Sequence, residues 1–149
     1  MAKQADKYAA LKLENQLCFP LYAAAREVVN YYTPYLSELG ITYTQYIAFM
    51  VLWENDGMTV GELGRRLFLD NGTLTPMLKK LEKMGFIERK RCADDERVVK
   101  IHVTEQGFEL REKCLSIPNE VGRCVKVTPE EAATLYGLLY KLLGKEDRD

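Results

Sequence analysis

The fold of this chain is decided between residues 59 and 103, where the sequence is TVGELGRRLFLDNGTLTPMLKKLEKMGFIERKRCADDERVVKIHV. At its start, Thr59 and Glu62 have the spacing of a capping box, in which each side chain accepts a hydrogen bond from the other residue's backbone N–H. This pair predicts a short helix over 60–67.

A second helix follows, and many of the basic side chains of this stretch lie on it. Asp70 or Asn71 can cap it, and we expect it to run to Met84 and to end at Gly85. Pro76 has no backbone N–H, so the helix loses one hydrogen bond unless Pro76 lies in its first turn. The apolar residues recur with helical spacing: Leu74, Met77, Leu78 and Leu81.

The periodicity then changes from helix to strand. Residues 86–91 are strand-like, 99–103 alternates apolar with polar residues, and the polar run 92–96 between them predicts a hairpin loop. Two helices joined by a short turn can place the second in the major groove of DNA, and a hairpin can reach sideways as a wing. We therefore predict a mainly α protein (α+β) with a winged helix-turn-helix lobe over about 43–103.

Helices are predicted on both sides of this lobe, and the 149 residues fit a single domain. The predicted flanking helices are 8–33, a short helix from Pro34 to Leu39 ended by Gly40, 43–55, a long helix from the Thr104 cap to about Val121, and a last helix after Thr128 and Pro129.

The composition excludes several classes of protein. No run approaches the roughly 18 consecutive apolar residues of a membrane-spanning helix, and the polar start MAKQADKYAA lacks a secretion core, so we expect a cytoplasmic protein without a membrane partner. The four cysteines form no CxxC motif and His102 is the single histidine, so the sequence predicts neither a metal site nor a cofactor.

The charge of the chain is unevenly distributed. The net charge is −1, which by itself gives no argument for nucleic acid. Between residues 79 and 91, however, six basic residues stand against two acidic ones, and a local basic surface is what a phosphate backbone requires. Taken alone, these lysines could form a solvated helix face; the order of the elements favours contact with DNA.

The segments FLDNGTLTPMLKKLEKMGFIERKR (68–91) and DDER (94–97) resemble the recognition helix and wing of MarR-type regulators. That resemblance covers roughly residues 11–145 and implies a homodimer on a pseudo-palindromic operator, with helices at about 8–40 and 105–145 forming the dimerisation domain. Asn71 stands where a serine is usual, which leaves the base preference open. The residues predicted to contact DNA are Asn71, Gly72, Thr73, Thr75, Pro76, Lys79, Lys80, Arg89, Lys90, Arg91, Asp95 and Arg97.

These residues suit DNA for different reasons. Threonine hydroxyls can hydrogen-bond phosphates or base edges, Gly72 allows close approach of the backbone, and lysines supply charge toward phosphates. Arg97 suits a narrow minor groove because of the negative potential there.

The segment LENQLCFPLYAAAREV (13–28) resembles the organic-hydroperoxide-resistance repressors within this family. The resemblance implies that Cys18 is oxidised by an organic hydroperoxide and that the repressor then leaves DNA. Tyr22, Tyr32 and Tyr43 match the tyrosines around that cysteine, and phenol hydroxyls can stabilise a thiolate by hydrogen bonding. Without the resemblance, Cys18 would be taken as a packing residue.

Spacing along the chain constrains this site. Tyr22 is four residues from Cys18 and neighbours it on one helix face. Tyr32 is fourteen residues away, about 21 Å along a continuous helix. It can therefore reach only the Cys18 of a second chain whose helix pairs antiparallel. Pro20 either kinks the helix or marks its start, and the second case places Cys18 at a helix N-terminus, where the helix dipole favours a thiolate.

The resemblance also implies two possible oxidation products. Some family members close a disulfide between subunits with a cysteine near the last helix, and Cys124 is close to that position. The other product is a mixed disulfide with a small thiol. We favour Cys124 as the resolving cysteine, expect Cys114 to pack on its helix, and expect Cys92 to be exposed in the wing.

Three other functions remain open at this point. A regulator of this family could respond to a small aromatic ligand or another oxidant, with Cys18 incidental. A winged helix could bind only protein. A thiol peroxidase is a weaker alternative, because no arginine or threonine accompanies Cys18 in a peroxidase-like motif, and Arg26 is about 12 Å away along a helix. We therefore expect a regulator rather than an enzyme.

Overall fold

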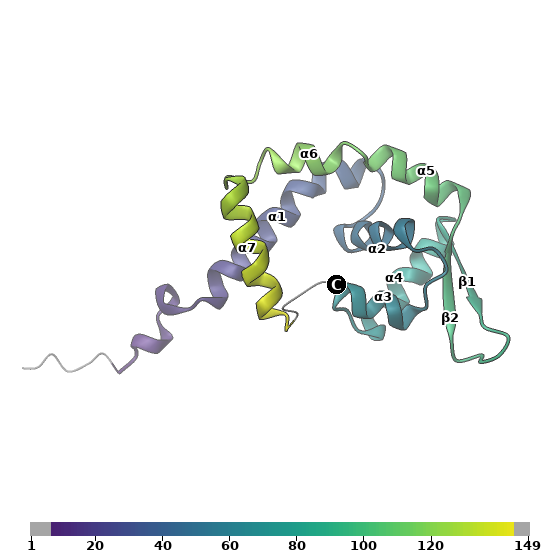
Figure 1. Ribbon diagram of the computed structural model, residues 1–149, viewed down its shortest axis with the longest axis horizontal. Helices are drawn as coiled ribbons and strands as arrows, with labels where there is room; N and C mark the ends of the chain where they lie inside the picture. The colour runs from purple at the N-terminus through teal and green to yellow at the C-terminus, as the bar shows by residue number, and fades with distance from the viewer. Residues whose placement is uncertain (1–6, 145–149) are drawn as a thin grey trace, which may run out of the picture.

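The computed structural model describes residues 7–144 and is mostly helical, with one small antiparallel sheet (Figure 1). Its elements in chain order are two 3-10 turns, η1 (Ala9–Leu11) and η2 (Leu13–Asn15), then α1 (Cys18–Glu38), α2 (Tyr43–Glu54), α3 (Val60–Leu67), α4 (Asn71–Lys83), β1 (Ile87–Arg91), β2 (Val99–Val103), α5 (Glu105–Cys114), α6 (Ile117–Gly122) and α7 (Pro129–Leu142).

The central lobe consists of α2, α3, α4 and the β1–β2 hairpin, in the order that the sequence predicts for a winged helix. The strands pair antiparallel with Ile87 opposite Val103 and Arg91 opposite Val99. The capping box forms as expected: the Thr59 N–H donates to Glu62 Oε2 at 2.8 Å, and the Glu62 N–H donates to Thr59 Oγ1 at 3.2 Å. The winged helix-turn-helix fold is therefore confirmed.

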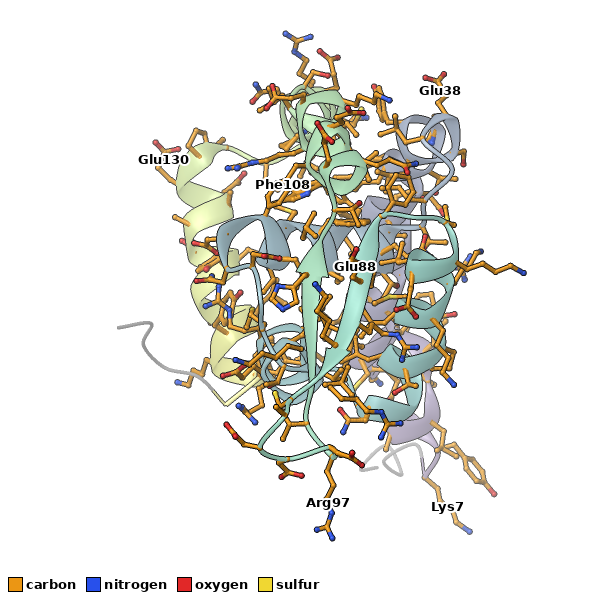
Figure 2. All side chains as sticks on the ribbon, turned by 90° about the vertical axis from the view of Figure 1, so that its right-hand side faces the viewer. Lys7, Glu38, Glu88, Arg97, Phe108 and Glu130 are labelled. Atoms are coloured by element: carbon orange, nitrogen blue, oxygen red, sulfur yellow. The ribbon has the colours of Figure 1, made fainter. Side chains whose placement is uncertain are left out.

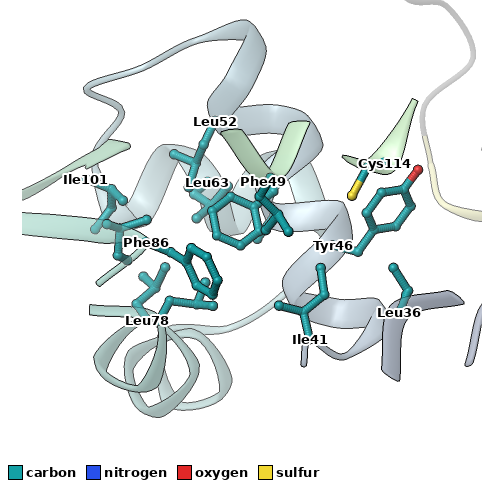
Figure 3. Close-up of a cluster of buried hydrophobic side chains, with 14 of the residues drawn as sticks. Leu36, Ile41, Tyr46, Phe49, Leu52, Leu63, Leu78, Phe86, Ile101 and Cys114 are labelled. Atoms are coloured by element: carbon teal, nitrogen blue, oxygen red, sulfur yellow. The ribbon is translucent and has the colours of Figure 1, made fainter. Parts of the chain in front are cut away.

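Helix α2 runs through the middle of this lobe and organises its core. Ala48, Phe49 and Leu52 are fully buried on it. Figure 3 shows the Phe49 and Phe86 rings in the same apolar cluster, where they meet edge to face with centroids 5.9 Å apart. Because residues from α2, α3, α4 and both strands share this core, the lobe behaves as one packed unit.

The hairpin is tied to the loop between α2 and α3 by backbone hydrogen bonds. The Gly57 N–H donates to the Ile101 carbonyl at 2.9 Å, and the Ile101 N–H donates to the Met58 carbonyl at 2.8 Å. The Asp56 carboxylate accepts from the Val103 N–H at 2.7 Å. These bonds fix the base of the wing to the helical part of the lobe.

The prediction of one helix over 8–33 is wrong at both ends. The first described elements are 3-10 turns, held by side-chain amides of Asn15 and Gln16 that donate to the carbonyls of Ala9 and Ala10. Such local side-chain bonds compete with helix formation. Helix α1 then starts at Cys18, so that Pro20 falls in the first turn, where its missing N–H costs no hydrogen bond.

Pro34 does not stop α1, and the separate short helix expected from Pro34 to Leu39 does not form. The helix continues through Pro34 to Glu38. The lost backbone bond is tolerated on an exposed face, where water can reach the free carbonyl. The Thr33 hydroxyl, one residue earlier, donates to the Val29 carbonyl at 3.3 Å.

The predicted long helix from Thr104 to Val121 is divided into α5 and α6. Thr104 caps α5 as expected, with its hydroxyl oxygen accepting from the Gly107 N–H at 3.1 Å. Pro118 lies in the first turn of α6 and has no N–H to donate to the Cys114 carbonyl four residues earlier. The chain breaks into two helices at this point, with Pro118 in the first turn of the second helix, where the missing N–H costs no hydrogen bond.

Helix α7 begins at the predicted Thr128 cap but has no buried residue. Its leucines and the first turns of α1 line an apolar groove of about 800 Å³, open to solvent: Leu17, Pro20, Leu21, Ala24, Leu135, Leu138, Leu139 and Leu142. A helix with an apolar stripe and no buried residue needs a further surface against which to pack.

Two further observations concern residues 7–144 as a whole. None of their helices combines the length and the apolar character that crossing a bilayer requires. Nor do their His, Cys, Asp and Glu side chains gather in groups of three or more, as they would around a metal ion.

Adding a side chain at Gly107 tests how closely α5 packs on the hairpin. A Cβ at this position would lie 2.2 Å from the Phe86 carbonyl oxygen and 2.6 Å from Val103 Cγ1. We expect Gly107→Ala to lower the free energy of unfolding by about 2 kcal/mol through overpacking, measured by urea denaturation. The matched control is Gly61→Ala in the first turn of α3, where the nearest atom is 3.8 Å away on the flexible Arg65 side chain. Equal stability of the two variants would contradict this packing.

Candidate nucleic-acid interface and cysteine site

The start of α4 is fixed by Asp70. The Thr73 N–H donates to Asp70 Oδ1 at 2.9 Å, and the Thr73 hydroxyl donates to Asp70 Oδ2 at 3.0 Å. These bonds lower the pKa of Asp70. Of the two predicted caps, Asp70 is therefore the one used, and Asn71 is the first residue of α4. Pro76 lies beyond the first turn, inside the helix.

A cleft of about 380 Å³ separates α4 from the wing and brings predicted residues of both together. Asn71 and Thr75 from α4 line it, as does Arg97 from the hairpin loop. The first turn of α3 forms another wall. The exposed Lys79 and Lys80 lie farther along α4, and Gly72 and Thr73 are exposed at its start.

The wing loop holds Arg97 at its tip. Figure 2 shows the Arg97 side chain pointing away from the body of the molecule. Asp95 shapes the turn: its carboxylate accepts from the Arg97 N–H at 3.0 Å, and its carbonyl accepts from the Val98 N–H at 3.0 Å. Asp95 is therefore placed to set the position of Arg97.

The three cations of β1 are placed differently from one another. Arg89 is half-buried and forms an ion pair with Glu82, with both Nε and a terminal nitrogen 2.9 Å from Glu82 Oε2. Burial raises the pKa of Glu82, but its bonds to Arg89 outweigh that effect and the pKa is lowered. Lys90 pairs with Glu88 at 2.9 Å, and Arg91 donates to the Glu96 carbonyl at 3.2 Å on the exposed side of the hairpin.

Two further cations of the lobe, Arg65 and Arg66, were missed in the sequence. Both are exposed in the last turn of α3. Arg66 pairs with Glu54 at 3.3 Å, and Arg65 lines the hollow beside the turn from α3 to α4. The two arginines are adjacent in the sequence, on the first helix of the helix-turn-helix. Because that helix crosses the DNA backbone, their position was a signal that could have been used.

Cys18 is the first residue of α1 and is exposed. Leu17 precedes it and provides no side-chain cap, while the Phe19 N–H donates to the Gln16 carbonyl at 3.3 Å and Pro20 has no N–H. Cys18 therefore lies at the N-terminal end of α1, where the helix dipole is positive. Tyr22 follows one turn later on the same face, and the Arg26 guanidinium lies 5.5 Å from the Tyr22 ring centroid. At this end of α1, a thiol, a phenol and a guanidinium therefore lie beside exposed apolar side chains, among them Leu17 and Phe19.

Tyr32 and Tyr43 meet at the other end of α1, together with Tyr46. The ring centroids are 4.9 Å apart for Tyr32 and Tyr43, and 5.7 Å apart for Tyr32 and Tyr46. Burial raises the pKa of all three phenols, to about 12 for Tyr46. They therefore remain hydrogen-bond donors at neutral pH. Tyr46 was not predicted to join this site, although its spacing of three from Tyr43 on one helix was a signal.

The structure does not bring Cys18 to Tyr32 and Tyr43 of its own chain. Fourteen residues of continuous helix separate Cys18 from Tyr32, about 21 Å along the axis. Tyr22 alone of the predicted tyrosines shares its end of α1 with Cys18.

The other three cysteines lie in different surroundings. Cys114 is buried beside Tyr46 (Figure 3), as expected of a packing residue, and burial raises its pKa to about 11. Cys92 is half-buried rather than exposed as expected, and its backbone N–H donates to the Val98 carbonyl at the base of the wing loop. Cys124 is exposed just after α6.

Comparison with known proteins places this geometry in a family. The family described as transcriptional regulator SarA/Rot matches residues 30–114. The organic hydroperoxide resistance transcriptional regulator of Bacillus subtilis is 49% identical over 138 residues, 93% of this chain and 94% of the relative.

Two solved structures of AbfR, a protein of Staphylococcus epidermidis, have the same fold. Reduced AbfR bound to DNA is 34% identical, with a TM-score of 0.74 over 90% of this chain and 94% of that one. Disulfide-formed AbfR is 35% identical, with a TM-score of 0.64 over 89% and 93%. The chain described here therefore belongs to the MarR- and SarA-type winged-helix transcriptional regulators, in the branch of the organic-hydroperoxide-resistance regulators.

Proposed function

We propose that this chain is a dimeric repressor that binds a pseudo-palindromic DNA operator and releases it when an organic hydroperoxide oxidises Cys18. The observation that carries this proposal is the separation of Cys18 from Tyr32 and Tyr43 along one unbroken helix. A site that needs both is complete only when a second copy supplies Cys18 to the tyrosines. The sensing thiol and the dimer geometry are then coupled.

The exposed apolar surface supports a dimer through the helices outside the lobe. The groove between α1 and α7 is lined almost entirely by apolar side chains, and Leu17 is 74% exposed beside it. Covering such a surface is favourable by about 25 cal/mol per Å². A second copy, with its own α1 and α7 inside the predicted dimerisation ranges of about 8–40 and 105–145, offers the matching surface.

The oxidation consumes one hydroperoxide. The Cys18 thiolate attacks a peroxide oxygen, a sulfur–oxygen bond forms, the O–O bond breaks, and the alcohol leaves with a proton. Donor hydroxyls of the tyrosines stabilise the thiolate before the attack. The apolar surroundings of Cys18, such as Leu17 and Phe19, favour an organic hydroperoxide over a small polar oxidant.

The resulting sulfenic acid is resolved by Cys124 of the other subunit. The Cys124 thiol attacks the Cys18 sulfur, a disulfide forms, and the oxygen leaves as water. Cys124 follows α6, which packs against α1, whereas Cys114 is buried in the core and Cys92 lies on the wing. A disulfide between subunits fixes their spacing, and DNA half-sites tolerate little change in spacing.

The DNA contacts follow from the surface of the lobe. Asn71, Thr75 and the lysines of α4 face the major groove, and Arg97 reaches the adjacent minor groove from the wing. Asp95 holds the arginine in place. Arg89 supports the fold through Glu82, while Lys90 and Arg91 add positive charge near the phosphates.

Replacing Cys18 tests the sensor. We expect reduced Cys18→Ser to bind a duplex selected from a random pool as tightly as the wild type. One equivalent of cumene hydroperoxide should weaken wild-type binding by about tenfold or more and leave the variant unchanged, measured by fluorescence anisotropy. Cys92→Ser is the matched control and should behave as the wild type. Release of Cys18→Ser by the peroxide would reject Cys18 as the sensor, and release by a phenol in its place would favour a ligand-controlled regulator.

Replacing Cys124 tests the oxidation product. After the same treatment, the wild type should run as a covalent dimer on a denaturing, non-reducing gel. Cys124→Ser should run as single chains on the same gel, and intact mass should show that its Cys18 is oxidised. Cys92→Ser should again form the covalent dimer. A covalent dimer of Cys124→Ser would exclude Cys124 as the partner.

Replacing Arg97 tests the wing contact. We expect Arg97→Ala to weaken DNA binding by about 1–3 kcal/mol and to reduce the slope of log affinity against log salt by about one. The control is Arg123→Ala, since Arg123 is 75% exposed on the distant α6 end and pairs only with Glu120 among the described ion pairs. An unchanged salt slope for Arg97→Ala would place the wing away from the DNA.

A further inference from the structure

The turn between α3 and α4 contains an aromatic residue in a strained conformation. Phe68 directly follows α3 and has φ 55° and ψ 37°, in the left-handed region. Within residues 7–144 it is the one non-glycine residue with a positive φ. Bulky side chains rarely adopt this conformation, whereas glycine adopts it readily. The chain therefore carries a phenyl ring at a position where the backbone favours glycine.

The packing of the turn imposes this conformation. The N–H groups of Phe68 and Leu69 both donate to the Gly64 carbonyl, the second at 3.0 Å. A Cβ on Gly64 would lie 2.7 Å from the Leu69 carbonyl oxygen and 3.2 Å from Leu74 Cδ1. The turn is thus pressed against α3 and the core, and α4 begins at Asn71, three residues after Phe68. Glycine would form the same turn with less strain, so the backbone gives no reason for a phenyl ring.

The Phe68 side chain lies on the surface that carries the predicted DNA contacts. It is 43% exposed and lines an open hollow of about 630 Å³ together with Arg65 of α3 and Asn71 of α4. Asn71 and Gly61 also line the cleft between α4 and the wing, which Arg97 closes on the other side. The hollow and the cleft therefore adjoin each other at Asn71 and form one continuous surface.

We propose that Phe68 is a specificity-determining residue whose ring packs against the C5-methyl group of a thymine in the major groove. This inference rests on the proposed function, because it adds a contact to the same DNA surface. In a helix-turn-helix, the N-terminal residues of the second helix reach the base edges, and Phe68 lies just before that helix. The thymine methyl is the apolar group that a base pair presents in the major groove. Strained residues persist where such a site needs them.

Phe68→Ala tests the contact. It removes the ring and keeps a Cβ in the left-handed turn. On a duplex that the wild type selects from a random pool, we expect Phe68→Ala to bind about tenfold more weakly, because a buried apolar contact is lost in both half-sites. The slope of log affinity against log salt should stay unchanged, since no charge is removed. Both quantities are measured by fluorescence anisotropy.

Replacing thymine by uracil identifies the group that the ring contacts, because uracil lacks only the C5-methyl group. Each thymine of the selected duplex is replaced in turn, at symmetric positions of the two half-sites. One replacement should weaken wild-type binding by about tenfold. The same replacement should leave Phe68→Ala within about twofold of its affinity for the thymine duplex, since the two changes remove one shared contact.

Two controls separate the contact from a general loss of structure. Phe68→Gly should melt at a higher temperature than Phe68→Ala, because glycine adopts the left-handed conformation without strain, yet both variants should bind DNA equally weakly. Phe108→Ala removes a ring of similar exposure, 39%, from α5. Figure 2 shows Phe108 well away from Arg97 and the wing tip, so this variant should bind DNA as the wild type does.

The outcomes separate this inference from the proposed function. If Phe68→Ala binds the selected duplex as tightly as the wild type, the ring makes no contact and the inference is overturned, while the repressor stands. If the loss in Phe68→Ala adds to the effect of every uracil replacement, the ring does not pack on a thymine methyl and the specificity role is rejected. If the wild type selects no duplex at all, the proposed function itself fails.

Discussion

The arrangement of this protein depends on the continuity of α1. An α-helix is stiff over its length and rises a fixed distance per residue, so the helix from Cys18 to Glu38 holds its two ends apart. Two proline residues could have broken it. Pro20 lies in the first turn and Pro34 on an exposed face, so neither does. The Cys18 thiol and the phenols of Tyr32 and Tyr43 therefore belong to the same chain but lie too far apart to contact each other.

Helix α2 belongs to two parts of the molecule at once. Its first turns carry Tyr43 and Tyr46, which contact Tyr32 of α1. Its later residues, Phe49 and Leu52, form the core on which α3, α4 and the hairpin pack. A change at the tyrosines therefore acts on a rigid element of the lobe rather than on a loop. In the proposed function, α2 is the physical link between a reaction at the cysteine and the orientation of α4.

Local signals predicted most of the fold. The capping pairs Thr59–Glu62 and Thr128–Glu131 and the alternation over 99–103 act within a few residues, so they are readable without the tertiary structure. The start of α1 was not predictable in the same way, since Asn15 and Gln16 divert the backbone into 3-10 turns. The break between α5 and α6 was signalled by Pro118, which the apolar periodicity obscured.

The candidate site was predicted less completely than the fold. The family resemblance made Cys18, Tyr32 and the residues of α4 candidates, but it did not indicate which side chains already have partners within the chain. Arg89 reaches Glu82 only because the turn after α4 brings β1 back along the helix. The backbone bonds between the wing base and the loop after α2 carry a consequence for DNA release. In the proposed complex with DNA, a tilt of the lobe moves the hairpin and α4 together, because both share one core. The contacts of the wing and of α4 with the DNA are then lost in the same event, and no state with only one of them attached is expected.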